Sequence, residues 1–464
     1  KLAENLGGDP VVSEFEFLVT SDLHGQIFAT DYTVDASQSG TYKRGLTRVS
    51  SYIKEQRALY GDNLYVVDMG DTIQGAPLTY YYAFNKPETD DPAIKAFRTI
   101  GYDMWVVGNH EFNYGLNILN RQLNYATSAS TATEKQLSVS LANYLDATTN
   151  SDESKDWATW RGYDPYVIKD FDGVKVAIIG FGNPNIPTWD IPANWEGIYF
   201  ADIIETYKKY EPEMKAKADM IVVVAHSGIN SDVKSDFIGD LIEQTDSIAF
   251  AFSGHEHNNK DWTLKNAKGE DVHVLQPYTK ARSIAQVKVS YDKATGEATV
   301  TPTLVNMENY KLDEDLVKVL QPYEDTTWNE YMLEKIGEAS ADFTAQELGT
   351  KPSAFMDLVN TVQLWGAYDN TGKNTPDNPK DDKPAQLSIS APLTSGDNAN
   401  IINKGDIYLG DMFKLYRFEN WFYQVTMKGE EIHQWLEFAA TKIKVVNGKP
   451  TVSTGDLTYY LSLI

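Results

Sequence analysis

The chain has 464 residues, more than one typical core can organise, so we expect two domains. Its formal charge of −25, without a basic stripe, argues against a nucleic-acid polymer as partner. It contains no cysteine, so any metal must be held by His, Asp, Glu, Asn or water. No apolar run of about eighteen residues is present, so we expect no transmembrane segment. Lys1–Asn5 carries no signal-peptide pattern.

Short apolar runs and helical spacings alternate along the first half of the chain. Strands are predicted at 14–21, 64–69, 104–107, 174–180, 220–225 and 248–252. Helices are predicted at 44–60, from Asp91–Pro92 onward, and at 116–125, 203–217 and 237–244. Further strands are predicted at 272–276, 284–289 and 298–304. This alternation predicts an α/β unit with helices on both faces.

The C-terminal part has a different pattern. Residues 311–336 are predicted to be largely helical despite Pro322. The second unit is predicted to contain helices at 354–368 and 430–440 and strands at 387–390 and 422–427. We therefore expect a domain at 1–310, a helical connector at 311–350 and a smaller α+β domain at 351–464.

Five apolar runs end abruptly in Asp, Asn or His, and five of the seven histidines lie at these ends. The residues concerned are Asp22, His24, Asp71, Asn109, His110, His226, His255 and His257. Each motif alone is more simply interpreted as a surface turn or a satisfied strand-end histidine. Ligands of open α/β sheets gather beyond the carboxyl ends of the strands, so the joint occurrence predicts one site. The donor types suit two divalent cations, with Asp71 as the best candidate for a bridging ligand.

These motifs resemble the calcineurin-like metallophosphoesterase superfamily, in the family's order. They are Asp22-Leu23-His24, Gly70–Gly75, Gly108-Asn109-His110-Glu111, His226 and Gly254-His255-Glu256-His257. Within it, the chain resembles the 5′-nucleotidase / 2′,3′-cyclic-nucleotide 2′-phosphodiesterase family, which Asn185–Asp190, Lys404–Ile407, Leu415–Asn420 and Lys428–Glu430 also match. The resemblance implies a two-sheet αββα metallophosphoesterase sandwich followed by a smaller C-terminal α+β nucleotide-binding domain.

The resemblance also implies roles for individual residues. One metal would be held by Asp22, His24, Asp71 and His257, and the other by Asp71, Asn109, His226 and His255. The two divalent ions, for which Zn, Mn, Fe and Co are all suitable, would activate a water for in-line attack on phosphorus. His110 would stabilise the transition state or protonate the leaving oxygen. Many relatives have Asp at the position of Asn113, where it orients the catalytic histidine. Asn113 can accept a hydrogen bond from His110, but it cannot stabilise the His110 imidazolium by charge.

Substrate preference is expected to depend on the C-terminal domain. Phe418 matches a family aromatic that stacks on the nucleobase, with a core position as the alternative interpretation. The second stacking aromatic has no clear counterpart, so we expect this domain to be incomplete. The loop at 390–396 lacks the arginine of strict 5′-nucleotidases, which favours a 2′,3′-cyclic-nucleotide 2′-phosphodiesterase / 3′-nucleotidase.

Three alternatives stay open at this point. The chain could be a 5′-nucleotidase, a hydrolase of another phosphate, nucleotide-sugar or sulfur ester, or a surface binding protein without turnover. The family resemblance implies an extracytoplasmic location. The sequence does not indicate an oligomeric state.

Overall fold

A computed structural model describes residues 11–32, 42–229, 237–344, 353–368, 385–390, 401–415, 423–452 and 462–463. The chain divides into two compact units, Lys1–Asp325 and Thr326–Ile464. The first unit contains two six-stranded sheets, and the second contains short strand pairs and helices.

The first sheet has the strand order β14-β13-β1-β2-β3-β4. Its strands are β1 (Val12–Thr20), β2 (Leu64–Asp68), β3 (Met104–Trp105), β4 (Ser138–Val139), β13 (Ser283–Asp292) and β14 (Glu297–Asn306). The strands β1 to β4 run parallel, whereas β13 and β14 are added antiparallel at one edge. Every residue of β2 is buried, as expected for a parallel strand that is covered on both faces.

The second sheet has the order β11-β12-β10-β9-β7-β6. Its strands are β6 (Tyr166–Phe171), β7 (Val174–Phe181), β9 (Met220–Ala225), β10 (Ile248–Ser253), β11 (Lys260–Lys265) and β12 (Asp271–Gln276). The four central strands are parallel and the two edge strands are antiparallel. A minor pair joins β5 (Tyr144–Asp146) to β8 (Ile198–Phe200).

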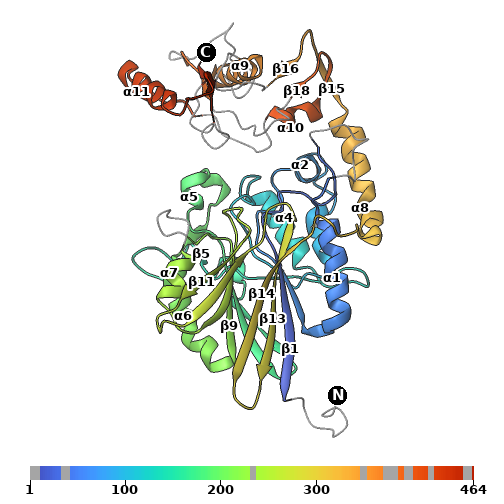
Figure 1. The fold of residues 1–464 in the computed structure, drawn as a ribbon, viewed down its shortest axis with the longest axis vertical. Helices are drawn as coiled ribbons and strands as arrows, with labels where there is room; N and C mark the ends of the chain where they lie inside the picture. The colour runs from blue at the N-terminus through green and yellow to red at the C-terminus, as the bar shows by residue number, and fades with distance from the viewer. Residues whose placement is uncertain are drawn as a thin grey trace. The chain divides into compact units, whose positions relative to one another are not determined.

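Helices cover the outer faces of the two sheets and complete an αββα sandwich. Figure 1 shows α1 (Leu46–Tyr60) on the side of β1 and β13, and α6 (Ile203–Lys217) with α7 (Ile238–Glu243) on the opposite side. This unit also contains α2 (Pro77–Phe84), α3 (Pro92–Ile100), α4 (Leu116–Ala126) and α5 (Ile186–Trp189). The two-sheet α/β sandwich that the resemblance implies is confirmed.

Aromatic side chains fill the space between the sheets. Phe17 of β1 packs with its ring centroid 5.7 Å from Phe171 of β6 and 5.5 Å from Phe250 of β10. Phe15 stacks on Phe171 at 4.4 Å. All four rings are fully buried, and each contributes about 1.5–3 kcal/mol by leaving water.

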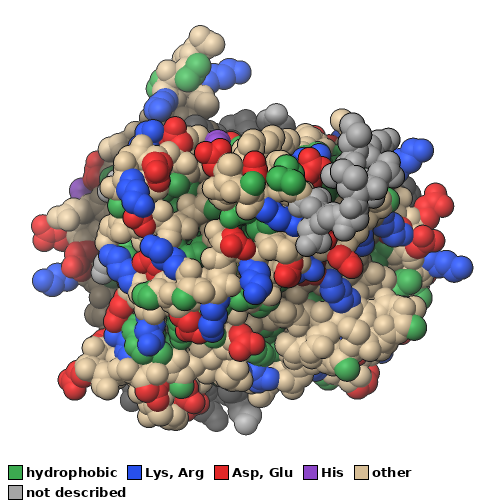
Figure 2. Space-filling view, turned by 90° about the horizontal axis from the view of Figure 1, so that it is seen from below, with side chains coloured by type: hydrophobic (Ala, Val, Ile, Leu, Met, Phe, Trp, Pro, Cys, Tyr) green, Lys and Arg blue, Asp and Glu red, His purple; other side chains and the backbone are tan. Residues whose placement is uncertain are grey.

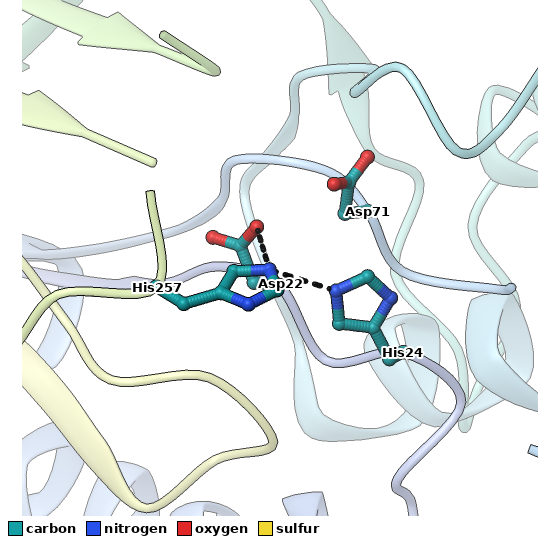
Figure 3. Close-up of side chains that lie close together, drawn as sticks. All are labelled: Asp22, His24, Asp71 and His257. Carbon is teal, nitrogen blue, oxygen red and sulfur yellow. Dashed lines mark hydrogen bonds and ion pairs between the residues drawn. The ribbon is translucent and has the colours of Figure 1, made fainter. Parts of the chain in front are cut away.

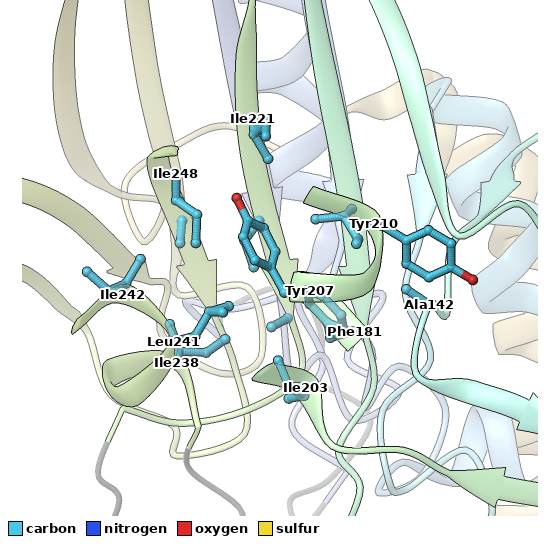
Figure 4. Close-up of a cluster of buried hydrophobic side chains, with 14 of the residues drawn as sticks. Ala142, Phe181, Ile203, Tyr207, Tyr210, Ile221, Ile238, Leu241, Ile242 and Ile248 are labelled. Carbon is cyan, nitrogen blue, oxygen red and sulfur yellow. The ribbon is translucent and has the colours of Figure 1, made fainter. Parts of the chain in front are cut away.

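A second apolar cluster anchors α6 and α7 to the other sheet (Figure 4). Ile203 and Tyr207 of α6 and Leu241 of α7 pack against Ile221 of β9 and Phe181 of β7. This packing holds the carboxyl ends of β7, β9 and β10 in a rigid frame.

The second unit is α+β, as expected. It contains α9 (Ala354–Tyr368), α10 (Met412–Leu415) and α11 (Gly429–Ala440). Short antiparallel pairs join β15 (Lys335–Ala339) to β19 (Gly405–Tyr408), β16 (Phe343–Thr344) to β18 (Ile401–Ile402), β17 (Ile389–Ser390) to β22 (Ser462–Leu463), and β20 (Lys444–Val446) to β21 (Lys449–Thr451).

Of two local predictions, one is confirmed and one is wrong. Residues 311–336 are largely helical despite Pro322, as α8 (Glu314–Thr327) and one π-helical turn at Trp328–Met332, although Lys335 already belongs to a strand. The strand expected at 422–427 is irregular over its described residues 423–427. Most of these residues are exposed, whereas strands are favoured where their side chains pack on a half-buried surface.

The surface seen from below the sheets mixes both signs of charge. Figure 2 shows acidic and basic side chains interspersed on this face, with hydrophobic side chains scattered among them. The charge of −25 therefore does not form one continuous acidic field on this face. None of the helices in the described ranges combines the length and hydropathy that crossing a bilayer requires.

Candidate metal centre

The structure places all the predicted ligands beyond the carboxyl ends of five parallel strands. Asp22 and His24 follow β1, Asp71 follows β2, Asn109 and His110 follow β3, His226 follows β9, and His255 and His257 follow β10. Because β1, β2 and β3 are parallel neighbours in one sheet and β9 and β10 in the other, these ends meet at one edge of the sandwich.

Four of these side chains form a first group of donors (Figure 3). The ligand atoms of Asp22, His24, Asp71 and His257 all lie within 4.8 Å of one another. Nε2 of His257 is 3.2 Å from Oδ1 of Asp22 and 3.0 Å from Nε2 of His24. These are the four residues that the resemblance assigns to one metal.

A second group shares Asp71 with the first. The ligand atoms of Asp71, His226 and His255 also lie within 4.8 Å of one another. Oδ2 of Asp71 is 3.1 Å from Nε2 of His226. Oδ1 of Asn109 is 3.1 Å from the same nitrogen and 2.9 Å from Nδ1 of His255. Asp71 therefore has the place that a bridging carboxylate needs.

Backbone carbonyls orient two of the imidazoles. Nδ1 of His24 lies 2.9 Å from the carbonyl oxygen of Gln74, and Nδ1 of His226 lies 2.7 Å from that of Met69. A carbonyl only accepts hydrogen bonds, so each Nδ1 carries a proton, and the neutral ring then has its lone pair on Nε2. This arrangement is typical of histidines that bind metals.

The donor set fits a pair of divalent cations. The two groups contain only carboxylate, amide and imidazole donors, which suit Zn, Mn, Fe or Co. Oδ1 of Asp22 is buried, and Nε2 of His257, another member of the first group, lies 3.2 Å from it. Buried carboxylates are stabilised by a positively charged neighbour or by a metal ion.

Charge interactions shift the titration of these groups in the metal-free protein. Burial raises the pKa of Asp22, but the hydrogen bond from His257 and the charge of His226 outweigh it and lower the pKa to about 2. Burial lowers the pKa of His226, but the Asp71 carboxylate outweighs it and raises the pKa to about 10. Burial lowers the pKa of His24 to about 3 and that of His255 to about 4, helped by neighbouring imidazoles. Without metal, the buried carboxylates are thus balanced by a proton on His226.

The backbone is strained where these ligands lie. Five of them have φ in the left-handed region, at 54° for Asp22, 48° for His24, 53° for Asp71, 75° for His255 and 56° for His257. Each such residue costs on the order of 1–3 kcal/mol, which the surrounding packing must offset. Such clustering of strain is characteristic of functional sites.

Two glycines allow the turns after β2 and β3 to touch. A Cβ on Gly70 would collide with the backbone nitrogen of Gly108, and a Cβ on Gly108 would collide with the backbone nitrogen and Oδ1 of Asp71. Gly70 also has φ of 92°. Only glycine permits this close approach, which places Asn109 and His110 beside Asp71.

Glu111 belongs to the motif matched in the sequence, but no role was predicted for it; it is a fully buried carboxylate under the site. Its oxygens accept hydrogen bonds from the backbone nitrogens of Asp71 at 2.9 Å, Thr72 at 2.6 Å and Gly108 at 2.6 Å. Burial and the charge of Asp71 raise the pKa of Glu111 to about 7. The available signal was its position directly after Asn109–His110.

His110 lies at the rim of the site. Its side chain is 29% exposed, and Nε2 is 3.9 Å from Oδ2 of Asp71. Nδ1 is 2.6 Å from Oδ1 of Asn113, as the predicted pairing of these two residues requires. Trp189, for which the sequence predicted no role beyond its place in the Asn185–Asp190 motif, stacks on His255 with ring centroids 5.1 Å apart. Phe418 lies outside the described residues.

Comparisons with known families match both parts of the chain. The model of the calcineurin-like phosphoesterases matches residues 15–259, and that of the 5′-nucleotidase C-terminal domain matches residues 335–463.

Two curated proteins and one solved structure are similar over most of the chain. A 2′,3′-cyclic-nucleotide 2′-phosphodiesterase/3′-nucleotidase of Salmonella typhimurium is 30% identical over 94% of this chain and 70% of its own length. The trifunctional nucleotide phosphoesterase protein YfkN of Bacillus subtilis is 28% identical over 93% of this chain, which spans only 30% of that protein. A putative 5′-nucleotidase from Staphylococcus aureus has the same fold, with a TM-score of 0.73 at 23% identity, covering 97% of this chain and 82% of that one.

Proposed function

Because the chain belongs to the calcineurin-like phosphoesterase family, we propose that it is a metal-dependent hydrolase of nucleotide phosphate esters. Its favoured reactions are those of a 2′,3′-cyclic-nucleotide 2′-phosphodiesterase and 3′-nucleotidase. The printed name of the Salmonella typhimurium relative and the absence of arginine from the 390–396 loop support this preference.

One observation carries the proposal. Seven donors from five strand ends of two sheets converge in two groups that share Asp71. A chance surface cluster would not draw on strands this far apart in sequence. Nor would it keep its carboxylates buried among imidazoles that are oriented by backbone carbonyls.

The residues would divide the work as follows. One cation would be held by Asp22, His24, Asp71 and His257, and the other by Asp71, Asn109, His226 and His255. When bound, such a pair supplies positive charge for the phosphate and makes water acidic enough to act as a nucleophile at neutral pH. His110, at the rim, would donate a hydrogen bond to the departing oxygen or to the phosphoryl oxygens. Asn113 would hold its ring.

The C-terminal unit would bind the nucleoside part of the substrate. Phe418 is the proposed stacking residue, and a base–aromatic stack contributes about 1–3 kcal/mol. The domain boundaries near 310 and 350 are part of this proposal. The family resemblance also supports action outside the cytoplasm, which fractionation of the native host tests.

The test is release of phosphate and nucleoside from 2′,3′-cyclic AMP, 3′-AMP and 5′-AMP, after dialysis against chelator and addition of Mn²⁺ or Zn²⁺. We expect metal-dependent turnover of the cyclic and 3′ substrates, with 5′-AMP slower. The Asp71→Ala protein is the control, because it loses a donor common to both groups. Its turnover should fall by at least about a thousandfold.

The alternatives give different results. Faster turnover of 5′-AMP would replace the substrate preference while leaving the metal chemistry intact. Turnover only of sugar phosphates or sulfur esters would overturn the nucleotide assignment. Metal binding without any turnover would indicate a binding protein.

A further inference from the structure

We infer that Asp190 is a positioning residue that fixes the ring of His110 through the side-chain amide of Asn113. The inference rests on the proposed function, in which His110 assists phosphate-ester cleavage. It concerns the residue directly after α5, 77 positions along the chain from Asn113.

Three side chains form a continuous line of hydrogen bonds away from the site. Nδ1 of His110 donates to Oδ1 of Asn113 at 2.6 Å. Nδ2 of Asn113 donates to Oδ2 of Asp190 at 2.9 Å. The negative charge that Asn113 lacks therefore lies directly behind its amide.

Asp190 is held firmly in this position. It follows α5 directly, and it is only 8% exposed. Its second oxygen, Oδ1, accepts from Nδ2 of Asn194 at 2.8 Å and from the backbone nitrogen of Ile191 at 2.7 Å. Three donors thus fix the carboxylate, which cannot turn away from Asn113 without losing one of them.

The carboxylate of Asp190 determines which way the side-chain amide of Asn113 is turned. An amide presents an acceptor at one end and a donor at the other, whereas a carboxylate only accepts. Asp190 therefore forces Asn113 to direct Nδ2 toward it and Oδ1 toward His110. Nδ1 of His110 must then carry the proton, and Nε2 is the atom directed toward Asp71 and the site.

The same geometry explains why position 113 holds an amide. With Asp at both 113 and 190, two carboxylates would stand at hydrogen-bond distance and repel each other. With amides at both positions, Asn113 could turn over and offer its NH₂ group to His110. The hydrogen-bonded chain needs one carboxylate and one amide at positions 113 and 190. Exchanging the two residue types between these positions should preserve the chain of hydrogen bonds.

The experiment compares Asp190→Asn, Asn113→Asp and the double variant that carries both changes. We expect each single variant to lower kcat by about tenfold to a hundredfold, as loss of an aligned proton donor does, with KM within about twofold. The double variant should recover most of kcat. Asp246→Asn is the matched control, because it removes a carboxylate whose partners are the surface residues Lys215 and Lys268.

A second readout does not depend on turnover. The ¹⁵N shifts of the His110 ring, assigned with a His110→Gln variant, report which nitrogen carries the proton. Wild type and the double variant should show the Nδ1–H form, and Asp190→Asn should show a mixture. Unchanged kcat and an unchanged tautomer in Asp190→Asn would overturn the inference, as would a double variant no better than the singles. A correct tautomer pattern in a protein without any turnover would instead refute the proposed function alone.

Discussion

At the scale of single residues, the buried carboxylate of Glu111 organises the turns that carry the ligands. It draws the backbone nitrogens of Asp71, Thr72 and Gly108 toward one point, and each of them is a donor. An ionised or neutral carboxyl group can accept all of these bonds on its two oxygens. An amide cannot, because one of its ends only donates.

Glu111→Gln should therefore destabilise the protein although it changes no volume. Its NH₂ end would face one or two backbone donors, at a cost of about 1–3 kcal/mol for each unsatisfied group. Differential scanning calorimetry should show a clear fall in Tm. Metal binding, measured by titration, should also be weaker. Glu243→Gln, at an exposed position of α7, is the control, and an equal, small shift in both variants would contradict this role for Glu111.

His226 links metal binding to protons. The Asp71 carboxylate raises its pKa to about 10, so at pH 8 the metal-free protein carries a proton on this ring. A histidine must be neutral to bind a metal, so binding should release that proton, and affinity should rise with pH until about 10. His24 and His255, whose pKa values are lowered to about 3 and about 4, have no proton to release at pH 8.

Calorimetric titration with Zn²⁺ in buffers of different ionisation enthalpy counts the protons released. Wild type should release about one proton more at pH 8 than His226→Asn. Equal release by the two proteins would show that His226 is already neutral.

At the scale of elements, the ends of the strands and the turns after them determine the site. Gly70 and Gly108 bring the turns after β2 and β3 into backbone contact. The contact leaves no space for a single methyl group. The position of Asn109 and His110 relative to Asp71 therefore depends on a residue that offers no side chain.

Gly108→Ala should separate these two turns, because its Cβ would overlap the backbone and carboxylate of Asp71. We expect loss of bound metal, measured by atomic emission, and a Tm reduced by several degrees. Gly429→Ala, where no atom lies within 4 Å of the added methyl, should leave both unchanged. Normal metal content in Gly108→Ala would refute the contact as a requirement.

Many of the strands and helices could be predicted from the sequence. Continuous apolar runs located β1, β2, β9 and β10, and helical spacing located α9 with its observed bounds. Mixed exposure hid the edge strands β6 and β11. The roles of Glu111 and Asp190, both of which lie in matched motifs, were not predicted for a different reason. Their roles arise from partners brought close by folding, and a lone acidic residue carries no periodic signal.

At the scale of the molecule, the catalytic unit collects its donors from both sheets. Asp22 and Asp71 extend from the first sheet, whereas His226 and His257 extend from the second. Bound cations would therefore tie the two sheets together at their carboxyl edge, in addition to the aromatic packing around Phe17.

Added metal should accordingly raise the unfolding temperature of the dialysed protein. A ligand at a hundred times its Kd stabilises by about 2.7 kcal/mol when it binds only the folded state. Thermal scans with and without Mn²⁺ or Zn²⁺ measure this shift. Asp71→Ala should lose most of it, and an equal shift in that variant would mean that the stabilising ions bind elsewhere.

His257 lies 233 residues after His24, yet their ring nitrogens meet at 3.0 Å. A nascent chain that contains only β1, β2 and β3 lacks His226, His255 and His257. It therefore cannot form either group of donors. The group formed by Asp22, His24, Asp71 and His257 therefore becomes complete only after His257 has been synthesised and has joined its partners. Because the imidazoles of His24 and His257 lie so far apart in the sequence, this group of donors can form only late in synthesis of the chain.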